Sequence, residues 1–273
     1  MIFAVASVLI LSNSFGRVEV STVGAQVLSY VPADGGEVLF MPADRDFSRN
    51  REMHGGIPVC WPWFGRFGEP GSRMHGLARY QEWRVEEQTN SRVIFSLKSS
   101  EATRTMWPYD FKLHYTVDLG ERLRLSLVAM NTSKEAFSVT EGFHPYFRTK
   151  DVSRTIVKGL KSDLKVHPGI DGGHDCTCGG AYRLMAGEGG EMVEITSNAE
   201  CKLVVWNPGP DWPDWDPEGN LGRDDWRKFV CVEPTVIGRE NAITICPNEC
   251  ATFTMTIRRC GGASFREGCQ KEQ

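Results

Sequence analysis

Short runs of alternating apolar and polar residues extend along nearly the whole chain. In the clearest run, residues 123–131, Leu123, Leu125 and Leu127 alternate with Arg124 and Ser126. A period of two places successive side chains on opposite faces of a strand, so one face of this strand is predicted to be buried. Runs rich in β-branched and aromatic residues predict further strands at 18–23, 26–30, 93–97, 112–119, 137–140, 202–206, 229–233 and 252–257. Helical periodicity is hard to find, which predicts an all-β protein.

Turn residues separate these strands without dividing the chain. Gly120-Glu121 joins two alternating runs as a hairpin would, and 28 glycines and 14 prolines punctuate the rest. The chain contains no Pro/Ser-rich linker, fixed-period repeat or low-complexity tract. We therefore predict a single domain over residues 1–273, folded as a large antiparallel two-sheet β-sandwich. Long loops are expected at 42–75, 161–191 and 207–227, where a rigid β scaffold commonly carries its binding groups.

The apolar opening, residues 1–11, raises the question of membrane association. It is too short to span a bilayer and lacks the basic flank of a secretory signal. We interpret it as a buried first strand and expect a cytoplasmic protein. A cleaved signal is the alternative, since Ala4-Val5-Ala6 resembles a cleavage site.

The net charge and the cysteine content indicate which classes of partner and which metal sites to expect. With 31 basic and 35 acidic side chains the net charge is −4, which does not favour nucleic acid. We expect a monomer with a small-molecule partner and no membrane partner. The cysteine number is odd, which favours free thiols, at positions 60, 176, 178, 201, 231, 246, 250, 260 and 269. Two groups could suggest zinc, Cys176 and Cys178 with His174, and Cys246 with Cys250, but neither has the paired spacing of zinc sites. We therefore predict no metal. A zinc-stabilised interaction protein is the weaker alternative.

Four stretches combine ionisable groups with aromatic residues, Gly and Pro, namely residues 53–65, 74–79, 141–147 and 206–210 with 229–234. That combination suits a sugar, whose C–H faces stack on rings while its hydroxyls need a few donors and acceptors. We nevertheless interpret three of the aromatic residues as part of the hydrophobic core, with a platform for a sugar ring as the alternative: Trp61, Trp63 and Phe64.

Glu233 closes an apolar strand that we expect to end at Pro234. Burial there would raise its pKa toward neutrality, unless an arginine pairs with it. With His144 it would form a general acid and base, although His144 taken alone could be a buried, hydrogen-bonded imidazole. His75 and Arg79 would orient a ligand's oxygens, or else be a loop histidine and a solvated arginine.

Six ordered blocks match one family: residues 24–30, 54–65, 75–79, 142–147, 206–208 and 231–234. Over nearly its whole length the chain resembles the aldose 1-epimerase superfamily, and within it the branch of hexose-6-phosphate mutarotases. The resemblance implies a galactose-mutarotase-like β-sandwich, His144 as the general acid and Glu233 as the general base. It also implies substrate contacts at His75 and Arg79, to which we add His54.

The chain departs from that branch in its sugar and phosphate contacts. His54 stands where the family commonly has Arg, Met74 where it has Gln, and Gly179 where a Thr-Asp-Arg-x-Tyr block has Asp. Arg51 would be one source of the missing guanidinium. The resemblance implies cofactor-independent interconversion of the α and β anomers of an aldohexose, expected to be a hexose 6-phosphate. The alternative is a carbohydrate-binding module or regulator that keeps the cleft without turnover.

Overall fold

A computed structural model describes residues 7–49, 51–66, 72–175, 181–186, 192–199, 202–212 and 219–260. The strands are β1 (Val8–Asn13), β2 (Gly16–Ser21), β3 (Val27–Pro32), β4 (Val59–Cys60), β5 (Arg84–Gln88), β6 (Arg92–Lys98), β7 (Phe111–Leu119), β8 (Leu123–Asn131), β9 (Phe137–Val139), β10 (Glu141–Phe143), β11 (Tyr146–Arg148), β12 (Thr155–Lys158), β13 (Leu164–Lys165), β14 (Asp171–Asp175), β15 (Ala181–Ala186), β16 (Met192–Ser197), β17 (Lys202–Trp206), β18 (Phe229–Val236), β19 (Ile243–Ile245) and β20 (Cys250–Cys260). In these ranges the helices are short: α1 (Glu101–Met106) and the 3₁₀ turns η1 (Phe47–Arg49), η2 (Ala78–Tyr80), η3 (Val152–Arg154), η4 (Asp225–Lys228) and η5 (Arg239–Asn241). None of the described helices has the length and apolar character needed to cross a membrane.

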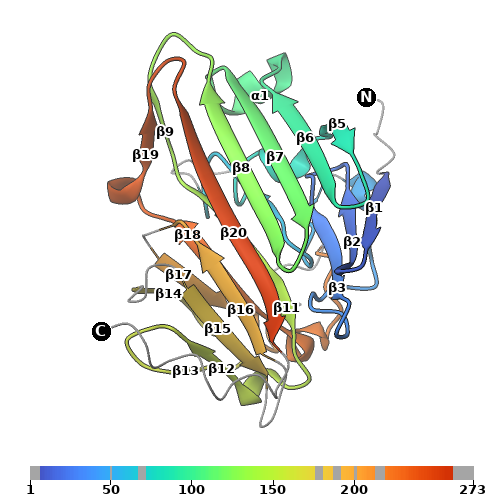
Figure 1. Ribbon diagram of the computed structural model, residues 1–273. Helices are drawn as coiled ribbons and strands as arrows, with labels where there is room; N and C mark the ends of the chain where they lie inside the picture. Colours follow the sequence, from blue (N-terminus) through green and yellow to red (C-terminus); the bar gives the residue numbers. More distant parts are fainter. Residues whose placement is uncertain are drawn as a thin grey trace, which may run out of the picture.

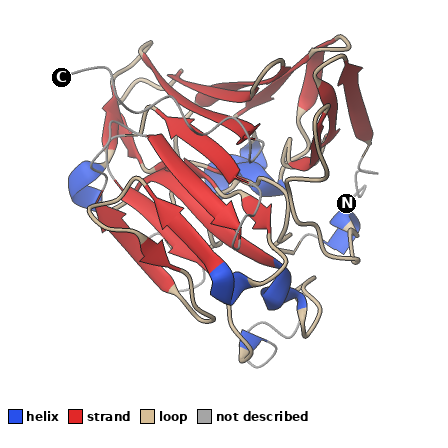
Figure 2. Cartoon of the chain, turned by 60° about the horizontal axis from the view of Figure 1, so that its bottom comes forward, coloured by secondary structure: helices blue, strands red, loops and turns tan. Residues whose placement is uncertain are grey.

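Two antiparallel sheets form the body of the molecule (Figures 1 and 2). The larger has nine strands in the order β13-β12-β15-β16-β20-β8-β7-β6-β5. The smaller has six, in the order β14-β17-β18-β10-β4, with β11 also paired to β18. A three-stranded sheet, β1-β2-β3, and the β9-β19 pair complete the described strands. The predicted all-β, two-sheet sandwich is confirmed.

The core lies between these two sheets. On β8 the alternation seen in the sequence is realised, since Leu123, Leu125 and Leu127 are almost fully buried while the intervening residues face outward. From the smaller sheet, Phe143 on β10 meets Phe253 on β20 with ring centroids 4.8 Å apart. The ring centroid of Tyr115 on β7 lies 5.7 Å from that of Phe143. Aromatic packing between the layers thus fixes how the smaller sheet sits on the larger one.

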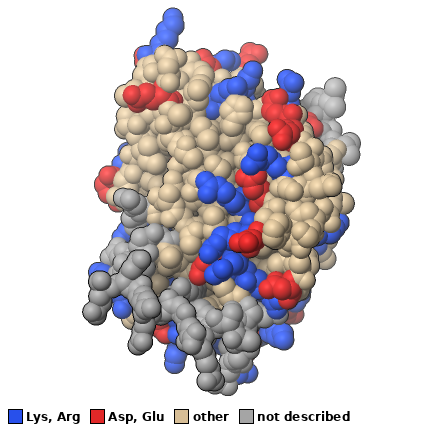
Figure 3. Space-filling view, viewed as in Figure 1, with Lys and Arg blue, Asp and Glu red and all other residues tan. Residues whose placement is uncertain are grey.

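Charged residues of both signs are interspersed on the outward face of the nine-stranded sheet (Figure 3). Arg122 Nη1 lies 2.6 Å from Glu194 Oε1, and Arg258 Nη2 lies 3.4 Å from the same oxygen. Exposed ion pairs of this kind contribute at most about 1 kcal/mol each, so this face contributes more to solubility than to stability.

Strands β10 and β11 are two parts of one line of pairing along β18. Glu141 pairs with Val236, and Tyr146 pairs with Cys231, in the same antiparallel register. The line is interrupted at His144 and Pro145, opposite the part of β18 that contains Pro234. Neither Pro145 nor Pro234 has an N–H to donate, so the hydrogen bonds of this strand pair are lost at one place. The prediction that the strand ends at Pro234 is wrong, because β18 continues to Val236.

Two further sequence interpretations are corrected. The first strand is not buried: β1 begins at Val8, pairs only with β2 among the described strands, and leaves Val8 and Ile10 about half exposed. The stretch 161–191 is not one loop, because it contains β13, β14 and β15. Gly172 and Gly173 hide β14 from pattern analysis, since they add no apolar side chains to a strand held by backbone pairing with β17.

Candidate active site

A cavity of about 420 Å³ lies on the outward face of the six-stranded sheet. Its floor consists of alternate residues on neighbouring strands, because side chains two apart on a strand share a face. Pairing sets Asp171 opposite Trp206 and Val204 opposite Glu233. The lining residues are Glu52, His54, Phe64, Gly65, Arg66, Met74, His75, His144, Tyr146, Asp171, Gly173, Val204, Trp206, Trp212, Glu233 and Ile237. This volume lies in the range of small-molecule sites.

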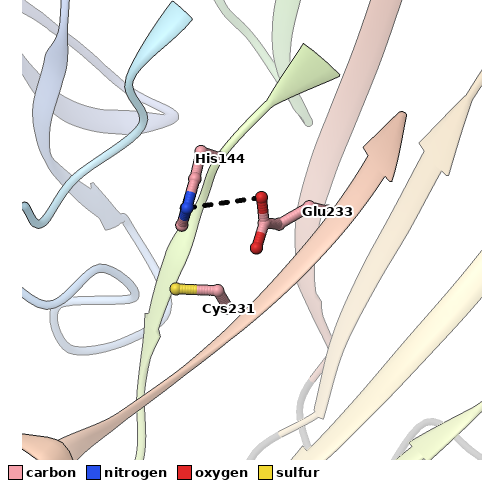
Figure 4. A group of neighbouring side chains, drawn as sticks. All are labelled: His144, Cys231 and Glu233. Carbon is pink, nitrogen blue, oxygen red and sulfur yellow. Dashed lines mark ion pairs between the residues drawn. The ribbon is translucent and has the colours of Figure 1, made fainter. Parts of the chain in front are cut away.

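His144 and Glu233 face each other on this floor (Figure 4). His144 Nε2 lies 3.4 Å from Glu233 Oε2, and the two side chains are 6% and 1% exposed. Continuing the pairing of Tyr146 with Cys231 places His144 directly opposite Glu233 across the strand pair. In the interruption His144 donates its backbone N–H to the carbonyl of Pro58 instead, at 3.1 Å. The two prolines that break the ladder therefore help to place the imidazole.

Burial shifts the pKa values of Glu233 and His144 in opposite directions. Burial raises the pKa of Glu233 well above its ordinary value, the charge of Asp171 raises it further, and Arg79 opposes the rise. Burial also lowers the pKa of His144 well below its ordinary value, and His75, Arg79 and His54 act in the same direction. Both shifts favour the uncharged forms, a protonated carboxyl and a neutral imidazole. Transfer of the carboxyl proton across the pair would give a carboxylate and an imidazolium without proton uptake from solvent. The predicted rise in the pKa of Glu233 is confirmed.

His75 and Tyr146 enclose the His144 imidazole. The Tyr146 ring stacks on it with centroids 4.8 Å apart and planes 10° apart. His75 meets it edge to face at 5.1 Å. The Gly65 N–H donates to His75 Nδ1 at 3.1 Å, so the proton of the neutral His75 ring lies on Nε2. Burial lowers the pKa of His75 to about 3, which keeps it a neutral hydrogen-bond donor at physiological pH.

His54 lies in the wall beside two tryptophans and is anchored by Asn220. Its backbone N–H donates to Asn220 Oδ1 at 2.8 Å, and its carbonyl accepts from Asn220 Nδ2 at 3.1 Å. His54 Nδ1 is 2.8 Å from the hydroxyl of Tyr146. The Trp212 ring lies edge-on at 4.7 Å, and that of Trp206 lies at 6.2 Å. A hydrogen bond thus joins His54 to the ring that stacks on His144.

Arg79 lies behind the cavity wall. Its Nη1 donates to Glu52 Oε1 at 3.0 Å and its Nη2 to the carbonyl of Met53 at 2.8 Å, with the side chain 1% exposed. Burial is the largest effect and raises the pKa of Glu52, but Arg79 together with His54, His75 and Arg66 outweighs it and holds that pKa below its usual value. Arg79 therefore positions a carboxylate that lines the cavity. Arg51 pairs with Asp44 at 2.5 Å, outside the lining residues.

Comparison with known proteins identifies the family. The family model for aldose 1-epimerase matches residues 7–169. The chain belongs to the aldose 1-epimerase family. A protein of Salmonella typhimurium named "Putative glucose-6-phosphate 1-epimerase" is 30% identical over 77% of this chain and 76% of its own length. One from Cenchrus ciliaris with the same name is 27% identical over 85% and 78%. The crystal structure of a "putative mutarotase" from Salmonella typhimurium shares the fold, with a TM-score of 0.84. The two sequences are 23% identical, and the match covers 94% of this chain and 91% of that chain.

For this aldose 1-epimerase family member, the sequence-based resemblance and the class of isomerase are confirmed. The structure brings together His144, Glu233, His75 and His54 around one cavity, while their roles, and that of Arg79, stay predictions. The side chains of all three aromatic residues, Trp61, Trp63 and Phe64, are buried in hydrophobic clusters as interpreted, and Phe64 also lines the cavity. The single domain, monomeric state, cytoplasmic location and lack of a metal also stay predictions. Cys176, Cys178 and Gly179 lie outside the described residues.

Sequence reasoning missed several lining residues, chiefly Glu52, Arg66, Asp171 and Trp212. Asp171 stands on the glycine-containing strand that showed no alternation, and Arg66 follows the aromatic block without any pattern of its own. Arg66 is exposed and is the one Arg or Lys among the described lining residues. Asn207, which a matched block contains, is structural instead: its amide donates to the carbonyls of Trp226 and Phe229 at 2.7 and 2.8 Å.

Proposed function

We propose that this protein interconverts the α and β anomers of an aldohexose, with hexose 6-phosphates as its substrates. The observation that carries the proposal is the 3.4 Å contact between His144 and Glu233 on the floor of a cavity that suits one sugar ring. Family membership supports the reaction, and the names of the relatives support the phosphorylated substrate.

In the proposed mechanism Glu233, as carboxylate, takes the proton of the C1 hydroxyl. His144, as imidazolium, gives its proton to the ring oxygen, and the C1–O5 bond opens. Rotation about C1–C2 turns the other carbonyl face to the C5 hydroxyl. Reclosure with the proton transfers reversed yields the other anomer. The neutral His75 would hold a sugar oxygen through its Nε2–H, and Trp206 offers an apolar surface to the C–H face of the ring.

The substrate's phosphate requires a cation at the cavity. Arg79 is engaged by Glu52, and Arg51 by Asp44. Arg66 lines the cavity and forms no ion pair with the described residues. We assign phosphate recognition to Arg66, whose planar guanidinium can bind two phosphate oxygens at once.

The test is anomer exchange of glucose and of glucose 6-phosphate, followed by NMR. We expect acceleration by the wild type, faster with the phosphorylated sugar. Glu233→Gln and His144→Asn should each lower the rate by about 10²- to 10⁴-fold. Glu194→Gln, which changes a carboxylate on the opposite face of the molecule, should keep the full rate.

Circular dichroism and thermal melting of each variant separate lost chemistry from lost folding. Wild-type rates with both sugars that merely equal the buffer-catalysed background would reject the enzyme. Sugar binding by calorimetry in that case would support the carbohydrate-binding alternative.

A further inference from the structure

Cys231 lies beside the catalytic pair and has no part in the proposed proton transfers. Its Sγ, a ring nitrogen of His144 and a carboxylate oxygen of Glu233 all lie within 4.8 Å of one another, and Figure 4 shows the three side chains converging. We propose that these three residues form a binding site for Zn²⁺, and that zinc inhibits the enzyme by occupying both proton-transfer groups. The inhibition rests on the proposed function, whereas the metal site does not.

The backbone places the three ligands before any metal arrives. Cys231 and Glu233 are two residues apart on β18, so they share a face of the strand. The pairing of Tyr146 with Cys231 brings His144 opposite Glu233 on that same face. β18 is an interior strand of its sheet, with β17 on one side and β10 and β11 on the other. Such a frame holds the three side chains on one face of the sheet, so that small side-chain adjustments would bring their donor atoms to zinc-binding distance.

The donor set suits zinc in particular. Thiolate, imidazole and carboxylate are its usual protein ligands, and zinc sites with three such ligands leave a fourth position open. Here that position faces the cavity, because His144 and Glu233 both line it while Cys231 lies beneath. Mg²⁺, which prefers six oxygen ligands, does not fit this set.

A second observation, independent of the ligand spacing, also indicates a cation. Within the described part of the chain, neither carboxylate oxygen of Glu233 accepts a hydrogen bond, and Nδ1 of His144 has no partner. Both side chains are more than nine-tenths buried. Buried polar atoms are normally paired because leaving them unpaired is costly. A dication bound to these groups would remove that cost.

Binding is a proton-for-metal exchange without redox change. The thiol of Cys231 and the carboxyl of Glu233 give up their protons to solvent as their S and O atoms bind Zn²⁺. His144 binds through the lone pair of its neutral ring. With the metal in place Glu233 can no longer accept the C1 proton, and the metal-bound nitrogen of His144 can no longer carry a proton to the ring oxygen.

The first experiment measures mutarotation of the full chain in metal-free buffer, with free Zn²⁺ fixed by a nitrilotriacetate buffer. We expect inhibition of the wild type at micromolar zinc, reversal by EDTA and no effect of Mg²⁺. Cys231→Ala, with Cys231→Ser as a second variant in case the first folds poorly, should raise the half-inhibiting zinc concentration by at least about tenfold. Cys60→Ala, which removes a different buried thiol on β4, should behave as the wild type.

The second experiment needs no activity. Co²⁺ added to the wild type should give a thiolate-to-cobalt charge-transfer absorption, which Cys231→Ser removes and Cys60→Ala keeps. Equal zinc sensitivity of the wild type and both Cys231 variants, or a cobalt band unchanged in Cys231→Ser, would overturn the site. A wild type without mutarotase activity would reject the proposed function, while the cobalt spectrum would still decide the metal site.

Discussion

At the scale of single residues, the two arginines near the active-site cavity have different surroundings: Arg79 is buried and paired, whereas Arg66 is exposed and lines the cavity. Arg79 is the most deeply buried arginine near the site, and its guanidinium is committed to Glu52 and to a backbone carbonyl. Glu52 is thereby kept as a carboxylate in the wall. Arg66 stands at the opening with its charge unpaired by the described residues, which makes it the cation that an incoming phosphate meets first.

Arg66→Ala should therefore remove the preference for a phosphorylated sugar. A hydrogen bond to a charged group is worth about 1.5–3 kcal/mol, which corresponds to a loss of roughly 10- to 150-fold in kcat/KM for glucose 6-phosphate relative to glucose. The measurement is the ratio of the two exchange rates by NMR. Arg92→Ala, at an ion pair with Asp118 on the larger sheet, is the control and should leave the ratio unchanged. An unchanged ratio in Arg66→Ala would assign the phosphate to another group.

At the scale of elements, the sequence was informative where one face of a strand meets the core. β7 and β8 could be predicted because their alternation records burial on one side. β14 could not, because its glycines leave only backbone pairing, and register between distant strands leaves no local trace. The opposition of His144 and Glu233 depends on such a register, so the strand pattern could single out Glu233 but could not show that His144 lies opposite it.

The turn that carries His75 depends on a glycine. Gly76 has φ = +82°, and a Cβ there would lie 2.1 Å from the backbone carbonyl oxygen of Trp61. Gly76→Ala should therefore cost more than the 1–2 kcal/mol of the left-handed conformation alone, at least about 3 kcal/mol, and should displace His75 with loss of activity. Urea denaturation measures the first effect and anomer exchange the second.

Gly169→Ala is the matched control for that change. Its φ is +77° and nothing lies within 4 Å of the added Cβ, so only the conformational cost of about 1–2 kcal/mol should appear. Equal destabilisation by the two substitutions would show that the close approach to Trp61 does not constrain the turn.

At the scale of the whole molecule, both faces of the smaller sheet contain buried ionisable groups, one face toward the cavity and the other toward the core. Gly142, Glu233 and His144 belong to the outward, cavity face, whereas Glu141 alternates with Gly142 and lies with Phe143 on the face toward the core. Glu141 is 1% exposed, and within the described residues its Oε1 has no hydrogen-bond partner. Burial raises its pKa to about 8, so the core contains a carboxylic acid that is neutral at pH 7.

This buried acid should make the stability of the protein fall as pH rises. Between the ordinary pKa of 4.5 and about 8 the unfolded chain has lost the proton that the native state keeps, so each pH unit lowers the free energy of unfolding by up to about 1.4 kcal/mol. Glu141→Gln has no proton to lose, so its stability relative to the wild type should rise from pH 5 to pH 8 and level off above. Urea denaturation at each pH measures this, with Glu121→Gln on the surface as the control. If the free energies of unfolding of wild type and Glu141→Gln change in parallel with pH, Glu141 is not protonated in the folded state. If they diverge, proton binding by Glu141 in the folded state contributes to the stability of the protein.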